Sequence, residues 1–237
     1  LPLLLSSLFS IFYYGVLNHA YCFRYDRCII EKRSGVGVMD KFGLEIVPYI
    51  YDNIAPNSYW SPAYYRATYN NQKGILALDG TEIIPCIYDD VDTWLTTDNF
   101  MVKLGKLKGL YTPRGKVIVP CEFTKISRWR ETSLLHVKMD DQEGLYTLEG
   151  EEILPCQFII CKELNGISLI NCGGFSKDGK VQNGVWGAIN KKGKIIIPCK
   201  YNDIIPYAGS ERIEADGGYI KDIYDFNGNY LRSEYKW

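Results

Sequence analysis

Two short acidic clusters carry residue types that bind divalent cations. They are Asp89-Asp90-x-Asp92 and Asp140-Asp141-x-Glu143. Ca²⁺ binds carboxylate and carbonyl oxygens, but an established calcium loop alternates its ligands around a glycine, and neither cluster has that pattern. We therefore interpret both clusters as solvated loop faces, with a calcium site as the alternative.

A second candidate is a phosphate-binding loop, because Gly174–Lys180 has the spacing G-x-x-x-x-G-K. Val181 stands where a Ser or Thr would bind Mg²⁺, and Trp186-Gly187 opens a strand rather than the required helix. A surface loop is favoured. Gly35-Val36-Gly37 begins like a dinucleotide fingerprint but lacks the third glycine and the βαβ setting.

Nucleophilic catalysis requires a nucleophile placed beside a base, which is most often histidine. His19 and His136 are the only histidines of the chain, and neither lies in a Cys, Ser or acidic motif of that kind. We therefore predict no catalytic, cofactor-binding or metal-binding residues and no cofactor. The chain is expected not to be an enzyme.

The amino-acid composition excludes two further classes of protein. The 237 residues are 46% hydrophobic and carry 27 Lys+Arg against 28 Asp+Glu, a net charge of -1. A non-specific nucleic-acid binder needs a basic excess, and a disordered chain has low hydrophobicity and high net charge. Both classes are excluded, and a folded globular chain is expected.

The elements that would position any site come from an internal repeat. A glycine is followed six residues later by a second glycine and five residues after that by a proline, five times with unchanged spacing. A sixth, decayed copy has Asp222, Gly228 and Ser233 at these places. The complete copies are Gly37/Gly43/Pro48, Gly74/Gly80/Pro85, Gly109/Gly115/Pro120, Gly144/Gly150/Pro155 and Gly187/Gly193/Pro198.

Each copy predicts β-strands. Short β-branched runs such as Lys194–Ile197 lie between the second glycine and the proline, and pairs such as Asp79-Gly80 place glycine where a tight hairpin needs positive φ. The proline is expected to end the second strand. An aromatic residue three positions after the proline is expected to insert between one unit and the next. These aromatics are Tyr51, Tyr88, Phe123, Phe158 and Tyr201.

A further extended segment, such as Leu134–Lys138, precedes each first glycine, so each unit is predicted to be a three-stranded antiparallel meander of about 35 residues. The stretch Asp89 to Asp98 is the one place where a short helical turn is considered.

The pattern from Trp186 to Ile204, with Gly187, Gly193, Pro198 and Tyr201 in register, resembles the bacterial WG repeat. The resemblance covers residues 35–237, with divergent copies in which only Trp186 keeps the family's tryptophan. It implies an all-β repeat array that is usually taken as an interaction scaffold, and it implies no catalytic residues.

Cysteine placement follows the repeat. Four of the eight cysteines directly follow a repeat proline, about 35 residues apart and without the CxxC spacing of zinc sites. We predict structural thiols, because a repeat step of about 10 Å prevents cross-unit disulfides. The four are Cys86, Cys121, Cys156 and Cys199; Cys22, Cys28, Cys161 and Cys172 fit no pattern.

The N-terminal segment has its own composition. Residues 1–20 carry a long uncharged run, which is read either as a degraded signal or anchor or as a hydrophobic capping strand. Residues 21–34 are read as a degenerate repeat remnant, and residues 35–237 as the repeat domain. The protein is expected in the cell envelope or outside the cell if residues 1–20 are a signal or anchor remnant, and otherwise in the cytoplasm.

A unit this small cannot bury both faces alone, so stacking of units must supply the core. We predict an all-β array of tandem meanders in an open superhelical or arc-like arrangement, with a closed β-propeller as the alternative. The expected function is a non-enzymatic scaffold for protein–protein interaction. The partner is another protein and not a nucleic acid, and membrane association is expected only through residues 1–20. A surface glycan-binding module that uses exposed aromatics is the alternative.

Overall fold

The computed structural model describes residues 19–23, 26–57, 63–94, 98–130, 132–164, 166–207, 209 and 212–236. These residues form β-strands and no α-helix, so the predicted all-β class is confirmed. No helix among them is long and apolar enough to cross a membrane. Residues 1–18 lie outside the described residues, so the signal, anchor and capping alternatives for that segment stay predictions.

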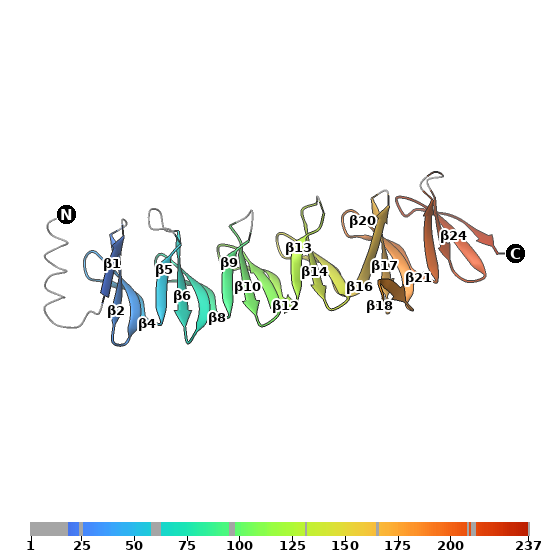
Figure 1. Ribbon diagram of the computed structural model, residues 1–237. Coiled ribbons are helices and arrows are strands. Elements are labelled where there is room, and N and C mark those ends of the chain that lie inside the picture. Colours follow the sequence, from blue (N-terminus) through green and yellow to red (C-terminus); the bar gives the residue numbers. More distant parts are fainter. Residues whose placement is uncertain are drawn as a thin grey trace. The chain divides into compact units, whose positions relative to one another are not determined.

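Successive strands form small antiparallel sheets in chain order, and neighbouring strands of one sheet are also neighbours in colour (Figure 1). The first sheet contains β1 (His19–Phe23), β2 (Arg27–Lys32), β3 (Gly35–Asp40) and β4 (Glu45–Tyr51). The second contains β5 (Asn53–Pro56), β6 (Tyr64–Tyr69), β7 (Gln72–Ala77) and β8 (Glu82–Tyr88). The third contains β9 (Asp90–Thr93), β10 (Phe100–Leu104), β11 (Leu107–Tyr111) and β12 (Val117–Phe123).

The next two repeats share one sheet through a long strand, and the last repeat has its own. The shared sheet contains β13 (Lys125–Arg128), β14 (Leu134–Met139), β15 (Gln142–Thr147), β16 (Glu152–Leu164), β17 (Ile167–Cys172), β20 (Val185–Asn190) and β21 (Ile195–Tyr201). A separate hairpin contains β18 (Phe175–Lys177) and β19 (Lys180–Gln182). The last sheet contains β22 (Asp203–Tyr207), β23 (Arg212–Asp216), β24 (Ile220–Asp225) and β25 (Tyr230–Tyr235).

Two compact parts divide the chain, one with β1 to β10 and the other with β13 to β25; β11 and β12 are split between them. No sheet of the described residues closes into a barrel or a propeller. The tandem array of small antiparallel sheets is therefore confirmed.

Four of the sheets have four strands, where the sequence predicts three per unit. The Pro-x-x-aromatic tail does not simply leave the hairpin: after the aromatic residue it forms the first strand of the next sheet, as β5 and β9 do. The helical turn considered for Asp89 to Asp98 does not form over Asp90–Thr93, which is strand β9 and pairs with β10; residues 95–97 lie outside the described residues. Strand β2 also pairs with β3, and the ladder includes the pair Lys32–Gly35 on either side of the predicted boundary at residue 34. Residues of the segment 21–34 therefore complete the first sheet.

The predicted end of the second strand at the proline is also wrong. Pro85 lies inside β8, where a bulge breaks the ladder: Lys73 pairs with Tyr88, but Ile75 pairs with Ile84. A bulge tolerates a residue without an N–H donor. The first glycine of the repeat makes room for it, since a Cβ on Gly74 would lie 2.5 Å from the Ile84 carbonyl oxygen.

The second glycine of the repeat lies in a turn that a side chain holds. Asp40 Oδ1 accepts hydrogen bonds from the N–H groups of Phe42 and Leu44, and Asn190 and Asp225 make the same pair of contacts in their turns. Gly80 has φ 89° in the equivalent turn, as the Asp79-Gly80 pair predicts.

The core lies between successive sheets. In the first part, Val47 of β4 packs with Tyr65 and Ala67 of β6 and with Leu76 of β7. In the second part, Ile197 and Tyr201 of β21 pack with residues of the last sheet, namely Ile204, Ile213, Ala215 and Tyr224. Each interface therefore supplies apolar burial that neither sheet has alone.

Candidate functional site

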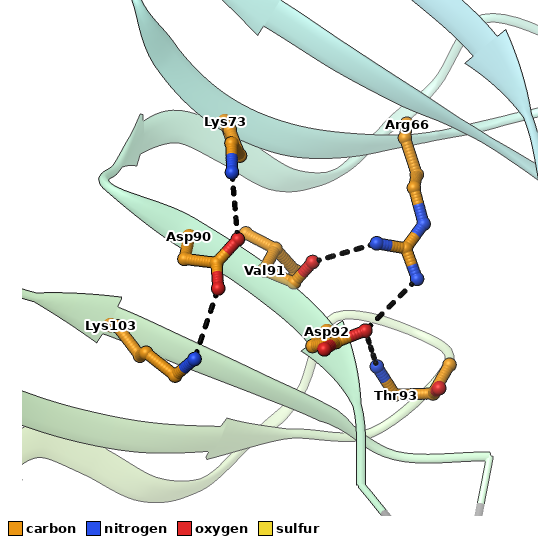
Figure 2. Close-up of polar contacts among 7 residues, drawn as sticks. All are labelled: Arg66, Lys73, Asp90, Val91, Asp92, Thr93 and Lys103. Carbon is orange, nitrogen blue, oxygen red and sulfur yellow. Dashed lines mark hydrogen bonds and ion pairs between the residues drawn. The ribbon is translucent and has the colours of Figure 1, made fainter.

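Asp90 and Asp92 of the first acidic cluster lie on strand β9 and face cations of their own and the preceding sheet, whereas Asp89 lies in the exposed bend before the strand. Figure 2 shows the Asp90 carboxylate between two ammonium groups, with Lys73 Nζ at 2.8 Å and Lys103 Nζ at 3.0 Å. Arg66 donates to the Val91 carbonyl at 3.1 Å and to Asp92 at 3.2 Å. The interpretation as a loop face is therefore wrong for Asp90 and Asp92, which join two sheets.

Hydrogen bonds and charge from Lys73 and Lys103 lower the pKa of the Asp90 carboxyl to about 2. The carboxylate is thus charged at all ordinary pH values and already neutralised by two cations. Among the described residues, no group of three or more His, Cys, Asp or Glu side chains could hold a metal ion. The cluster acts chemically as an ion-pair junction.

Replacement of Asp90 by asparagine is expected to lower the free energy of unfolding by about 1 kcal/mol at neutral pH, because two partly exposed ion pairs are lost. The folded pKa lies below the unfolded value, so this stability is present above about pH 4 and disappears as pH falls through about 2. Urea unfolding at several pH values measures it. Asp98→Asn, an exposed control, should show no such pH-dependent difference.

The aspartate that follows the repeat aromatic also serves the next sheet. Asp52 accepts from the Asn71 N–H at 3.0 Å, and Asp89 accepts from the Gly105 N–H at 2.6 Å. Asn71 and Gly105 lie in the turns that join the second and third strands of the following sheet. The Tyr-Asp pair of the motif is therefore structural in both copies that have it.

The repeat aromatics lie at the junctions between sheets, as predicted. The rings of Tyr88 and Tyr111 meet edge to face at 6.1 Å, and their hydroxyls are 2.7 Å apart. Four of the five aromatics are buried and Tyr51 is half-buried; the buried ones are Tyr88, Phe123, Phe158 and Tyr201. The glycan-binding alternative thereby loses the exposed rings on which it depended.

The residues of the second acidic cluster have two different roles. Two of them lie in a turn, and the third forms an ion pair that the sequence did not predict. Asp140 and Asp141 are exposed in the turn between β14 and β15, as expected of a solvated face. Glu143 instead meets His136 Nε2 at 2.8 Å and Lys138 Nζ at 3.5 Å. Burial opposes the charge of Glu143, but hydrogen bonds and charge from His136 and Lys138 outweigh it and lower the pKa.

The predicted hairpin could have indicated the ion pair of Glu143, because antiparallel pairing places Lys138 opposite Glu143. His136 also lies 5.2 Å from the Trp129 ring centre. The side chain of His19 is outside the described residues.

The segment with P-loop spacing forms the β18–β19 hairpin, with Lys177 opposite Lys180. Buried Asn171 holds its base: it donates to the Asn183 carbonyl at 3.1 Å and accepts from the Gly174 N–H at 3.0 Å. No helix follows, so the surface-loop reading stands with a short hairpin in the loop. Gly35-Val36-Gly37 belongs to strand β3.

The cysteines after the repeat prolines are thiols, as predicted, and they are half-buried. Burial raises the pKa of Cys86 and of Cys199 to about 11, which keeps these thiols protonated and poorly reactive. Cys28 is disulfide-bonded, a role that its irregular position in the sequence did not suggest. Cys22 stands opposite Cys28 in the β1–β2 ladder.

The clearest candidate for contact with another molecule is a row of exposed apolar residues on the first part, here called the apolar stripe. Ile50 and Ile87 occupy one repeat position, and Tyr69 and Leu104 occupy another. Their exposed fractions are 52%, 48%, 41% and 42%, respectively. Exposed apolar residues at recurring positions are typical of an interaction surface rather than of random exposure.

Contacts between the sheets connect the strands that carry the stripe. The Tyr51 ring, next to Ile50, meets the Tyr69 ring at 6.1 Å. Gln72, which pairs with Tyr69, donates to the Ile87 carbonyl at 2.9 Å. The hydrogen bond from Gly105 to Asp89 places the turn after Leu104 beside the end of β8. The stripe therefore follows three successive sheets.

The repeat frame on which these features recur is shared with a described family. The family model "WG containing repeat" matches residues 109–142 and 186–210. Two stretches of this chain therefore carry WG repeats. The repeat residues glycine, proline, tyrosine and aspartate lie at the bulges, turns and sheet junctions described above, so they account for the fold.

The solved structures that resemble this chain do so only at low TM-scores. The AfRom2 CNH domain matches with 12% identity over 93% of this chain and 84% of that one, at a TM-score of 0.28. Kluyveromyces lactis Hsv2p matches with 9% identity over 89% and 74%, also at 0.28. No curated protein matches the sequence.

Proposed function

We propose that this chain is a non-enzymatic scaffold that binds another protein through the apolar stripe. The observation that carries the proposal is the recurrence of exposed Ile50, Tyr69, Ile87 and Leu104 at two repeat positions on three successive sheets. Repeat arrays present extended surfaces of this kind, and aromatic and aliphatic side chains supply most of the energy at protein interfaces.

The charges around the stripe support a protein partner. Lys73 of β7 and Lys103 of β10 both pair with Asp90 of β9, in the two sheets that carry Tyr69, Ile87 and Leu104. The net charge of the chain is -1, so it offers no basic excess to a nucleic acid. An apolar row beside paired charges has the anatomy of a protein interface, with an apolar centre and a polar rim. A partner that lays an apolar segment along the row would bury all four side chains.

The test compares proteins captured by the purified chain with those captured by Ile87→Asp/Leu104→Asp. Val117→Asp is the matched control, because Val117 is also 42% exposed but lies at another repeat position. The stripe variant is expected to lose specific partners at least about tenfold in quantitative mass spectrometry, since truncating central contacts removes most binding energy. The control should keep them, and both variants should keep the circular dichroism spectrum of the native chain.

Two results would contradict the scaffold proposal. One is that the native chain captures no protein above the matrix under several buffer conditions. The other is that the captured proteins are lost equally from the stripe variant and the Val117→Asp control.

A further inference from the structure

The last strand, β25, differs from its equivalents in the earlier repeats. Pro48, Pro85 and Pro198 lie inside β4, β8 and β21, each beside a bulge that breaks the ladder. Proline and bulges are the usual devices that keep an edge strand from pairing with another chain. In β25 the proline is replaced by Ser233, and the pairs from Ile220–Tyr235 to Ile223–Arg232 run without a break. The register shift of this ladder lies at Leu231, between the pairs Ile223–Arg232 and Tyr224–Tyr230.

The free edge of β25 carries a regular set of hydrogen-bonding groups. Lys236 N–H donates to the Tyr219 carbonyl at 3.1 Å, so the backbone groups of Lys236 face β24. Because these groups alternate in direction along an antiparallel strand, those of Ser233 and Tyr235 point away from β24; the register shift at Leu231 interrupts the alternation there. Among the described residues, no strand pairs with that side of β25.

The side chains of β25 complement a second copy of the same strand. When two β25 strands pair antiparallel about Ser233, Arg232 stands opposite Glu234 of the second copy, and the reverse pair forms as well. Leu231 then stands opposite Tyr235 of the second copy. Opposite charges and aromatic–aliphatic pairs are the cross-strand pairs that stabilise a sheet. Leu231 is 51% exposed and Tyr235 is 74% exposed, so both have area to bury.

Charge also selects this register over its neighbours. The backbone groups of Ser233 and Tyr235 face outward, so the alternative registers that keep their hydrogen bonds are displaced by two residues. One alternative places Arg232 opposite Arg232 of the second copy, and the other places Glu234 opposite Glu234. Like charges directly opposite each other destabilise a sheet.

We propose that two copies of this chain associate through β25, edge to edge and antiparallel, with the two-fold axis at Ser233. The contact is isologous, because each copy offers the same strand to the other. The contact joins the last sheet of one copy to the last sheet of the other, so that the two form one continuous sheet. The stripe lies on other strands, so this self-association is independent of the proposed scaffold function.

The test measures the mass of the purified chain in solution by sedimentation across a wide range of concentration. The native chain is expected to show a monomer–dimer equilibrium. Ser233→Pro removes the central outward N–H, and so should leave a monomer while sparing the β24 ladder. Ser233→Ala is the matched control, which loses the side-chain hydrogen bond to Asp222 but keeps the N–H, and it should still dimerise.

Exchanging the charges at positions 232 and 234 tests the register of the dimer more directly than the Ser233 variants do. Arg232→Glu alone and Glu234→Arg alone should each weaken the dimer at least about tenfold, because like charges then face each other. An equimolar mixture of the two variants should form a mixed dimer, since every charge pair is again opposite. The proposal is overturned by a native chain that stays monomeric at all concentrations, by a dimer that survives Ser233→Pro, or by a mixture that forms no mixed dimer.

Discussion

Replacement of Gly74 by alanine is expected to lower the free energy of unfolding by about 3 kcal/mol, the upper end of what overpacking costs. A Cβ at this position would lie 2.5 Å from the Ile84 carbonyl oxygen and 2.7 Å from Cys86 Sγ. The backbone atoms of the bulge cannot yield without breaking the pairs on either side of it. Urea unfolding followed by circular dichroism measures the loss.

The matched control is Gly105→Ala, because Gly105 has a positive φ of 58° but nothing within 4 Å of an added Cβ. Only the left-handed backbone then opposes alanine, at a cost of about 1 kcal/mol. If both variants lose the same stability, the close approach at the bulge is not what requires glycine.

Replacement of Tyr201 by alanine is expected to cost about 4 kcal/mol, as for other large aromatic residues truncated in a core. Tyr201 is buried against Ile204, Ile213 and Tyr224 of the last sheet. Its hydroxyl donates to Asp222 Oδ2 at 2.7 Å and lies 2.6 Å from the Tyr224 hydroxyl. Burial and these two partners raise its pKa, so the ring stays neutral.

Tyr201→Phe separates the two contributions, because it keeps the ring and removes only the hydroxyl, at about 1 kcal/mol. Tyr219→Ala is the exposed control and should change stability by less than about 0.5 kcal/mol, since Tyr219 is 91% exposed. Thermal and urea unfolding of the three variants measure these differences. A Tyr201→Ala variant as stable as the control would show that the last junction contributes little.

Fixed spacing made the architecture predictable from the sequence. Gly80 and its equivalents marked the turns, and the aromatics such as Tyr88 marked the junctions, because both roles depend on local geometry or on burial that a single residue type satisfies. The fourth strand was not predictable in the same way. Whether Asn53–Pro56 ends one unit or begins the next depends on which strand it pairs with, and that pairing is non-local.

The ion-pair junction was missed for a related reason. Asp90 is 17 residues from Lys73 and 13 residues from Lys103, and these three side chains meet only once the register of two sheets is known. The equivalent position varies among the other repeats, with Asn53, Lys125 and Asp203 among its residues, so the repeat pattern does not single out this junction. The apolar stripe was likewise hidden, since exposure of Ile87 beside buried Tyr88 is a property of the bulge.

Strand β16 has a consequence for how the chain opens. It pairs with β15 at Leu154 and with β17 at Ile160, so two successive repeats hold one strand in common. Neither repeat can release its backbone amides to water without freeing the strand on which the other depends. Hydrogen exchange should therefore find β14 to β17 protected as a single cooperative block, whereas the β5–β8 sheet, which shares no strand, exchanges separately.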